Sequence, residues 1–209
     1  MDAVTTRLTI ISGGLREPSS TRMLAGRLEA SVRTELAAAG VRVESSFVEL
    51  RPLGHAIIDA MFSGFPSPPL EEAFGTVADA DGVIAVTPAF NASFSGLFKS
   101  FFDVLPEETL SDMPILMGAT GGTERHSLVL EHALRPMFSY LHAIVSSRGV
   151  YAATDDFGSR TNGAVLGERI ARAASDYARL VRGCGSHRRR DSFSEDTAAM
   201  ERLLGGGRS

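Results

Sequence analysis

Residues 12–21, with the sequence SGGLREPSST, combine a glycine pair, one arginine and three neighbouring hydroxyl side chains. Arg16 supplies a permanent positive charge, and its planar group can bind two oxygens of one phosphate. Ser19, Ser20 and Thr21 directly precede apolar residues at helical spacing. A helix N-terminus attracts anions through its unpaired N–H groups and its dipole, so the segment predicts a phosphate site. The alternative is an ordinary hydroxyl cap beside an exposed arginine.

Two further segments have compositions that a simple connection does not need. In residues 87–96, TPAFNASFSG, the rigid Pro88 and the amide of Asn91 stand among small residues, which let a flat group approach the main chain. Residues 120–126, TGGTERH, hold a second glycine pair, which leaves N–H groups free to point at a ligand. Each segment also has the composition of an ordinary turn, so its place in the fold must decide between the two interpretations.

The cysteine count and the motif spacings exclude several classes of protein. Cys184 is the only cysteine, so the chain has no internal disulfide, no cysteine-based metal site and no phosphatase cysteine in its first loop. No lysine follows the first glycine pair as in a P-loop, and neither G-x-G-x-x-G nor the esterase pattern G-x-S-x-G occurs. The third apolar run does not end in the aspartate that a phosphorylated receiver domain needs.

Apolar runs and helical spacings alternate along the chain and predict the elements that position these segments. Strands are predicted at residues 7–12, 41–50, 82–87, 113–120 and 143–152. Helices are predicted at residues 20–39, 69–80, 94–105, 127–141 and 161–182. The alternation is typical of an α/β protein with a doubly wound parallel sheet, and five strands favour the flavodoxin-like order 2-1-3-4-5.

This topology brings the three unusual segments together. In an open α/β sheet the ligand binds beyond the carboxyl ends of the strands, at the point where the winding reverses. For the order 2-1-3-4-5 that point lies between strands 1 and 3, next to strand 4, and the three segments follow these three strands. A phosphate site, a narrow slot and a loop rich in N–H groups describe one ligand with a phosphate and a flat, polar-edged ring. FMN fits that description.

The same segments, in the same order along the chain, resemble a known enzyme family. SGGLREPSSTRMLA and TPAFNASFSGLFKSFFDVL are similar to signature segments of the NAD(P)H-dependent FMN reductases. GATGGTERHSLVLEHALRP is similar to the third loop and helix of the branch that supplies reduced flavin to alkanesulfonate-type and other luciferase-like monooxygenases. The resemblance covers residues 8–181.

The resemblance implies which residues bind FMN. In the first loop, Arg16, Ser19, Ser20 and Thr21 are expected to hold the phosphate, and Ser12, Gly14 and Leu15 are expected to belong to the same FMN site. Pro88, Ala89, Phe90 and Asn91 are expected along the ring, and Thr120, Gly121, Gly122 and Thr123 beside its pyrimidine edge. No catalytic residue and no metal ligand is nominated, because the cofactor carries the chemistry.

The chain departs from the family pattern at a few positions. Gly14 stands where many members have serine, and Ala89 and Phe90 replace the usual glutamate and tyrosine. His132 stands where alkanesulfonate-type members often have tyrosine, in a helix that tends to carry a π-bulge at the subunit interface.

The activity that the resemblance implies is hydride transfer from NADPH or NADH to FMN, with the reduced flavin passing to a flavin-dependent monooxygenase. It also implies a homodimer or homotetramer. Two alternatives stay open at this point. One is an FMN-bound quinone or azo-compound reductase, and the other is a flavodoxin-like electron carrier, although carriers usually flank FMN with tyrosine or tryptophan and this chain has no tryptophan.

Length, composition and charge set the remaining expectations. The chain has 209 residues, 44% of them hydrophobic, which suits one domain at residues 1–182 followed by a linker and short helix at 183–209. The net charge of -4 argues against a nucleic-acid partner. No apolar run reaches the ~20 residues of a membrane span, and the N-terminus does not have the pattern of a signal peptide. A cytoplasmic protein without a membrane partner is therefore expected.

Overall fold

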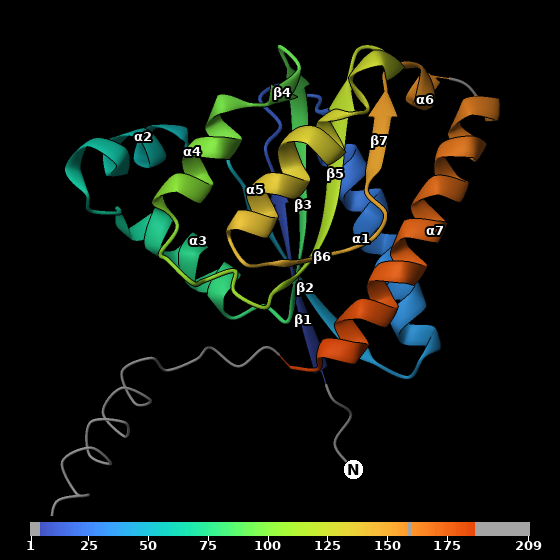
Figure 1. Ribbon diagram of the computed structural model, residues 1–209, viewed down its shortest axis with the longest axis horizontal. Helices are drawn as coiled ribbons and strands as arrows, with labels where there is room; N and C mark the ends of the chain where they lie inside the picture. The colour runs from blue at the N-terminus through green and yellow to red at the C-terminus, as the bar shows by residue number, and fades with distance from the viewer. Residues whose placement is uncertain (1–4, 159, 187–209) are drawn as a thin grey trace, which may run out of the picture.

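A parallel β-sheet with helices on both faces forms the centre of the protein (Figure 1). The computed structural model describes residues 5–158 and 160–186. The sheet follows the path β2-β1-β3-β5-β6, and its parallel strands are β1 (Thr5–Ser12), β2 (Arg42–Glu49), β3 (Gly82–Phe90), β5 (Pro114–Gly121), β6 (Ile144–Val145) and β7 (Val150–Ala153). The predicted flavodoxin-like order is confirmed, with β5 in the fourth position.

The fifth position of the sheet is divided between two short strands. Residues 143–152 were expected to form one strand, but β6 pairs with the start of β5 and β7 with its end. Between them, the carbonyl oxygens of Ser146 and Ser147 accept hydrogen bonds from the guanidinium of Arg135, at 3.1 and 3.3 Å. Arg148 pairs with Asp176 on the last long helix. Ser146 still donates its N–H to the carbonyl of Ile115 in β5 at 2.8 Å, and the contacts of Arg135 and Arg148 hold the residues at which the strand is interrupted.

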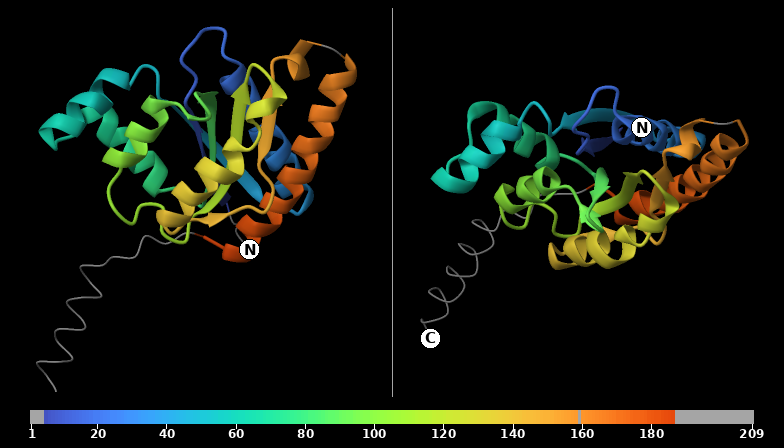
Figure 2. Two further views of the ribbon diagram at one scale, coloured as in Figure 1. Left: turned by 45° about the horizontal axis from the view of Figure 1, so that its top comes forward. Right: turned by 90° about the horizontal axis from the view of Figure 1, so that it is seen from above.

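Helices cover the two faces of the sheet in separate groups (Figure 2). One face packs against α1 (Ser20–Ala38) and α7 (Arg160–Cys184). The other packs against α2 (Gly54–Ser63), α3 (Pro68–Ala78), α4 (Gly96–Val104) and α5 (Arg135–Tyr140). Side chains of a strand alternate between the faces: Ile10 belongs to the α1/α7 core and Ile11 to the other.

The helix predicted at residues 127–141 is not a regular α-helix. A 3-10 turn, η1 (Glu124–His126), is followed by a π-helical turn, η2 (Leu130–Leu134), which continues into α5. Pro136 has no N–H, so it cannot donate to the carbonyl of His132 as an α-helix requires. The π-helical geometry that the resemblance implied around His132 is therefore confirmed.

The C-terminal boundary differs slightly from the expected one. Helix α7 continues to Cys184, two residues beyond the predicted end of the domain. The short segment α6 (Asp155–Gly158) precedes it. Most of the predicted linker and helix at 183–209 lies outside the described residues, so that division of the chain stays a prediction. No helix in the described part of the chain has the length and apolar character needed to cross a bilayer.

Tyr177 of α7 connects the two central strands at their amino-terminal ends. Its side chain is fully buried, and its hydroxyl lies 2.9 Å from the carbonyl oxygen of Val83 and 3.1 Å from that of Pro114. Burial raises the pKa of the Tyr177 phenol well above its usual value, and the neighbouring Cys184 raises it further. The phenol is therefore a neutral donor in the folded protein.

Tyr177→Phe should weaken the protein at neutral pH and reduce its sensitivity to alkali. An unfolded tyrosine ionises near pH ~10, whereas the folded phenol keeps its proton. The stability that Tyr177 contributes is thus fully present below about pH 10 and is lost as the pH rises further. At pH 7.5 the variant should lose roughly 1–3 kcal/mol of unfolding free energy, because two buried carbonyls lose their donor. Urea unfolding at pH 7.5 and at pH 10.5 measures both effects. If the wild type and the variant lose the same unfolding free energy between these two pH values, Tyr177 is not the group responsible for the alkaline loss.

Candidate functional site

The three segments singled out by their composition lie at one edge of the sheet, beyond the carboxyl ends of β1, β3 and β5 (Figures 1 and 2). The strands beneath them are in direct register, with Ser12 opposite Val86 and Pro88 opposite Thr120. The N–H of Gly13 also donates to the carbonyl of Val86 at 2.8 Å. The expected convergence of loops one, two and three, at residues 12–21, 87–95 and 120–126, is therefore present.

Loop one ends in a capped helix N-terminus. The hydroxyl oxygen of Ser19 accepts a hydrogen bond from the N–H of Arg22 at 3.1 Å, so the alternative of a serine cap is correct for this residue. The main-chain N–H groups of Ser20 and Thr21 have no acceptor among the described residues. Two N–H groups and the proton of the Ser19 hydroxyl thus remain at the start of the 19-residue helix α1.

Gly14 allows this cap to form. A β-carbon at position 14 would lie 2.1 Å from the hydroxyl oxygen of Ser19 and 3.2 Å from its β-carbon. The serine that many family members have at this position would displace the capping side chain in this chain. The departure from the family pattern therefore has a local structural reason.

The charged part of loop one is open to solvent. Leu15 and Arg16 are exposed, and Arg16 makes no ion pair or hydrogen bond with any described residue. Its neighbour Glu17 pairs instead with Arg51, at 3.2 Å. Ser12 differs from the rest of the loop, because it is only 3% exposed and its carbonyl accepts from the N–H of Leu50, directly after β2. Arg16 is consequently a cation of the loop without an ion-pair partner among the described residues, whereas Ser12 is buried.

A buried hydroxyl pair joins loop one to loop three. The Oγ1 atoms of Thr21 and Thr120 are 2.8 Å apart, and both residues are 3% exposed. The Thr21 side chain therefore faces the sheet, and its main-chain N–H is the group that remains available to an anion. Sequence reasoning placed both threonines at the site but did not identify them as partners.

Thr21→Val and Thr120→Val should each cost about 1–3 kcal/mol of unfolding free energy, because each leaves the opposite hydroxyl buried and unpaired. The double variant should cost less than the sum of the two, since valine keeps the shape of threonine and neither buried polar group remains. Urea unfolding of the four proteins measures the coupling. Strictly additive losses would show that the two hydroxyls do not interact.

Loop two is a β-hairpin and not a simple strand-to-helix connection. Strand β3 continues to Phe90, turns at Asn91 and Ala92, and returns as β4 (Ser93–Phe94). The φ angles of Asn91 and Ala92 are 49° and 66°, the left-handed region that the two central residues of a type I′ hairpin turn occupy. The alternative in which Asn91 serves turn formation is therefore correct for its backbone, and its side chain is exposed at the tip.

The base of this hairpin reaches loop three. Pro88 is buried, Ala89 is half-buried and Phe90 is 46% exposed. A β-carbon built on Gly121 would lie 3.7 Å from that of Ala89. On the other side, the hydroxyl of Thr87 accepts from the N–H of Ser95, which begins helix α4. The hairpin is thus fixed between the third loop and the Phe-rich helix.

Loop three is held by a residue that sequence reasoning did not select. The hydroxyl of Tyr151, on β7, donates to the carbonyl of Thr123 at 2.6 Å, and a β-carbon on Gly121 would lie 2.1 Å from that hydroxyl. The N–H groups of Gly122 and Thr123 have no acceptor among the described residues. The available signal was a tyrosine inside an apolar strand, because a buried phenol needs a polar partner.

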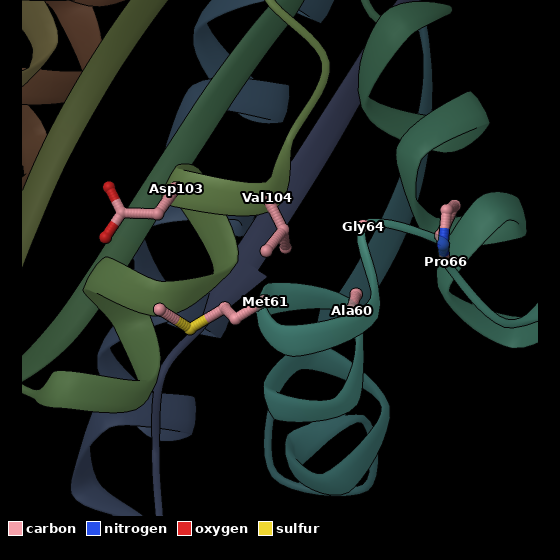
Figure 3. Close-up of a pocket in the computed structure, with 6 residues that line it drawn as sticks. All are labelled: Ala60, Met61, Gly64, Pro66, Asp103 and Val104. Atoms are coloured by element: carbon pink, nitrogen blue, oxygen red, sulfur yellow. The ribbon is translucent and has the colours of Figure 1, made fainter.

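A cavity elsewhere in the fold is separate from these loops. It has a volume of about 290 Å³ and lies between α2, the turn after it and the end of α4 (Figure 3). Its lining residues are Ala60, Met61, Gly64, Pro66, Asp103 and Val104, none of which belongs to the predicted site. The side chains of Met61 and Val104 point into the space between the two helices (Figure 3).

Comparison with known proteins identifies the family. The model of the NADPH-dependent FMN reductases matches residues 6–158. The chain belongs to this family. Among its relatives, the NADH-dependent FMN reductase SfnE of Pseudomonas putida is 34% identical over 178 residues, which cover 85% of this chain and 91% of that protein. The FMN reductase (NADPH) of Pseudomonas aeruginosa is also 34% identical over 178 residues, with coverages of 85% and 93%.

Two solved oxidoreductase structures superpose on most of the chain. An oxidoreductase from Corynebacterium diphtheriae has a TM-score of 0.82 and 42% identity, and the match covers 87% of this chain and 99% of that one. The apo form of the NADH:FMN oxidoreductase EmoB has a TM-score of 0.68 and 26% identity, with coverages of 81% and 88%. Both the fold and the family expected from the three segments are therefore confirmed.

Proposed function

We propose that this protein is an FMN reductase that uses NAD(P)H and that its FMN site is the edge where the three loops meet. The observation that carries the proposal is the contact between loops far apart in sequence. The Thr21 and Thr120 hydroxyls are 2.8 Å apart, and Ala89 adjoins Gly121. One ligand at this edge can reach all three loops at once.

Loop one suits the phosphate of FMN. Arg16 is a cation without an ion-pair partner among the described residues, and the N–H groups of Ser20 and Thr21 lie at the positive end of a long helix. The Ser19 hydroxyl accepts from Arg22 and keeps a proton to donate. Charge and donors together fit a dianionic phosphate, and the small Gly14 keeps the Ser19 side chain in place.

Loops two and three suit the flavin ring. Pro88, Ala89, Phe90 and Asn91 offer an apolar edge ending in an amide, and the free N–H groups of Gly122 and Thr123 can donate to the pyrimidine edge, where negative charge grows on reduction. Bound FMN supplies the chemistry by accepting a hydride from the nicotinamide. The chain then has to bind and orient its ligands, and no side chain is required as an acid or base.

We further propose that the reduced flavin is passed to a two-component monooxygenase and that the reaction takes place in the cytoplasm, where NAD(P)H is supplied. The support is the third segment, GATGGTERHSLVLEHALRP, with its π-helical turn at Leu130–Leu134. Both NADH and NADPH occur in the names of the relatives, so each is a candidate donor.

The test is the aerobic oxidation of NADH and NADPH by the purified protein, with and without added FMN. An FMN reductase oxidises NAD(P)H at a rate that rises with added FMN, because oxygen re-oxidises the reduced flavin, and it shows a preference between the two donors. If oxidation instead needs a quinone and is unaffected by free FMN, the protein is a quinone reductase. If neither acceptor supports oxidation, the proposed activity is wrong.

We also propose a homodimer or homotetramer. Ile58, Met61, Phe62 and Phe65 expose 41, 47, 88 and 80% of their surface on and after α2, beside the cavity of Figure 3. Leu128 and Tyr140, 62 and 82% exposed, flank the π-helical turn. Two apolar patches per chain are what a tetramer with two kinds of two-fold interface requires.

Phe62→Asp should reduce the molecular mass found by light scattering, because it places a charge in the first of these patches. Val165→Asp is a matched control, since Val165 is 51% exposed on α7, away from both patches. A monomeric wild-type protein would refute the assembly, and an unchanged mass for Phe62→Asp would exclude the α2 patch as an interface.

A further inference from the structure

Loop three is anchored from a neighbouring strand. Tyr151 of β7 is 5% exposed, and its hydroxyl donates to the carbonyl of Thr123 at 2.6 Å. The same hydroxyl occupies the space above Gly121, where a β-carbon would approach it to 2.1 Å. The phenol thus contacts both ends of the stretch 121–123, in which the N–H groups of Gly122 and Thr123 have no acceptor among the described residues.

The chemistry of the phenol suits a permanent donor. Burial raises the pKa of the Tyr151 phenol above its usual value, and the carboxylate of Asp156 raises it further. The hydroxyl therefore keeps its proton throughout the neutral range and can always donate to Thr123.

The main chain around Tyr151 is fixed by charged groups. Its carbonyl accepts from the guanidinium of Arg169 at 2.8 Å, and the same guanidinium pairs with Asp156 at 2.7 Å. The other oxygen of Asp156 accepts from the N–H of Ala153, at the end of β7. The N–H of Thr154 then donates to the carbonyl of Gly121 at 3.0 Å. The strand that carries the phenol is thus itself connected to the loop.

We propose that Tyr151 is a positioning residue for FMN, which holds Gly121 to Thr123 so that the N–H groups of Gly122 and Thr123 point at the pyrimidine edge of the ring. The inference rests on the proposed function. Tyr151 acts through loop three, and its own hydroxyl is occupied by the Thr123 carbonyl. The side chains of the loop do not hold it in place of Tyr151, because Gly122 has no side chain and Thr123 is exposed to solvent.

Tyr151→Phe tests this directly, since it removes one oxygen and keeps the ring. The KM for FMN should rise about tenfold while kcat changes less than about twofold, because a binding group is misplaced and the hydride donor is untouched. The absorption spectrum of bound FMN should also shift, since the hydrogen bonding at the pyrimidine edge changes. Unchanged KM and spectrum would overturn the proposal.

A second variant keeps the test sharp. Gly121→Ala pushes a methyl group against the Tyr151 hydroxyl and should raise the KM for FMN at least as much. In the double variant the hydroxyl is absent, and the nearest remaining ring atom would lie 3.2 Å from the new methyl. The double variant should therefore bind FMN more tightly than Gly121→Ala alone. If the increases in KM caused by the two single substitutions instead multiply in the double variant, the Tyr151 hydroxyl and the methyl group at position 121 do not compete for one space, and the inference is wrong.

Tyr177→Phe is the matched control, because it also removes a buried hydroxyl from main-chain carbonyls, at the opposite end of the sheet. Tyr177→Phe should lower the unfolding free energy without changing the KM for FMN. If it raises the KM for FMN as much as Tyr151→Phe does, the effect of Tyr151 is one of general stability and not of positioning. A wild-type protein that neither binds nor reduces FMN would refute the proposed function, whereas failure of the Tyr151 proposal appears only as normal FMN kinetics in the variant.

Discussion

Arg16→Ala should weaken FMN binding about 10- to 100-fold and leave riboflavin binding unchanged. A charge-assisted hydrogen bond contributes roughly 1.5–3 kcal/mol, which corresponds to this range of affinity. Arg16 has no competing partner among the described residues, so removing it should not free a buried carboxylate elsewhere. Riboflavin lacks the phosphate and therefore has nothing to lose when Arg16 is absent.

Flavin fluorescence titration of both ligands, at low and at high salt, measures this effect. The loss for FMN should shrink at high salt, since the arginine is exposed and its charge is screened. Arg33→Ala is the matched control, because it removes the same charge from α1 at a site where Arg33 pairs with Glu29, at 3.4 Å. If Arg16→Ala loses as much affinity for riboflavin as for FMN, or if Arg33→Ala loses as much affinity for FMN as Arg16→Ala, the assignment of the FMN phosphate to loop one is wrong.

Ala92→Phe should reduce FMN affinity on the order of 100-fold, a loss of ~2.7 kcal/mol. A phenyl group at the hairpin tip would occupy the slot that small residues leave open beside the ring. Ala92 already carries a β-carbon in the left-handed region, at a φ of 66°, so the larger side chain adds bulk with little extra backbone strain. A loss of binding can therefore be assigned to occlusion.

Ala92→Gly separates backbone strain from occlusion, because it changes the first and not the second. It removes the β-carbon from the left-handed conformation and should raise the unfolding free energy by about 1 kcal/mol. It adds no bulk, so FMN should bind as it does to the wild type. Thermal unfolding and flavin titration of both variants give the comparison. If Ala92→Phe binds FMN normally, loop two only connects the strand to helix α4.

Much of the fold follows from local patterns in the sequence. The uniformly apolar stretch from Gly82 to Val86 indicated a central parallel strand, and all five of those residues are buried. The positions of the three unusual segments after strands 1, 3 and 4 were enough to bring them to one edge, because parallel strands end on the same side. Ser19, Arg16 and the glycine pairs were selected on residue type alone.

Other features depend on packing and could not be read locally. Residues 143–152 have the composition of one strand, yet Arg135 and Asp176 divide it in two through contacts with distant elements. The hairpin at Asn91 likewise depends on the pairing of β4 with β3, which the spacing of apolar residues does not show.

The sequence by itself determined the fold class and the edge of the sheet at which the three unusual segments meet. Only the tertiary structure decided which polar groups meet each other. Thr21 and Thr120 are 99 residues apart along the chain, and Tyr151 reaches Thr123 from a neighbouring strand. The physical reason is that periodicity reports which side of an element is buried, whereas a hydrogen bond depends on the distance between two atoms. That distance is set by the packing of the whole sheet and its helices.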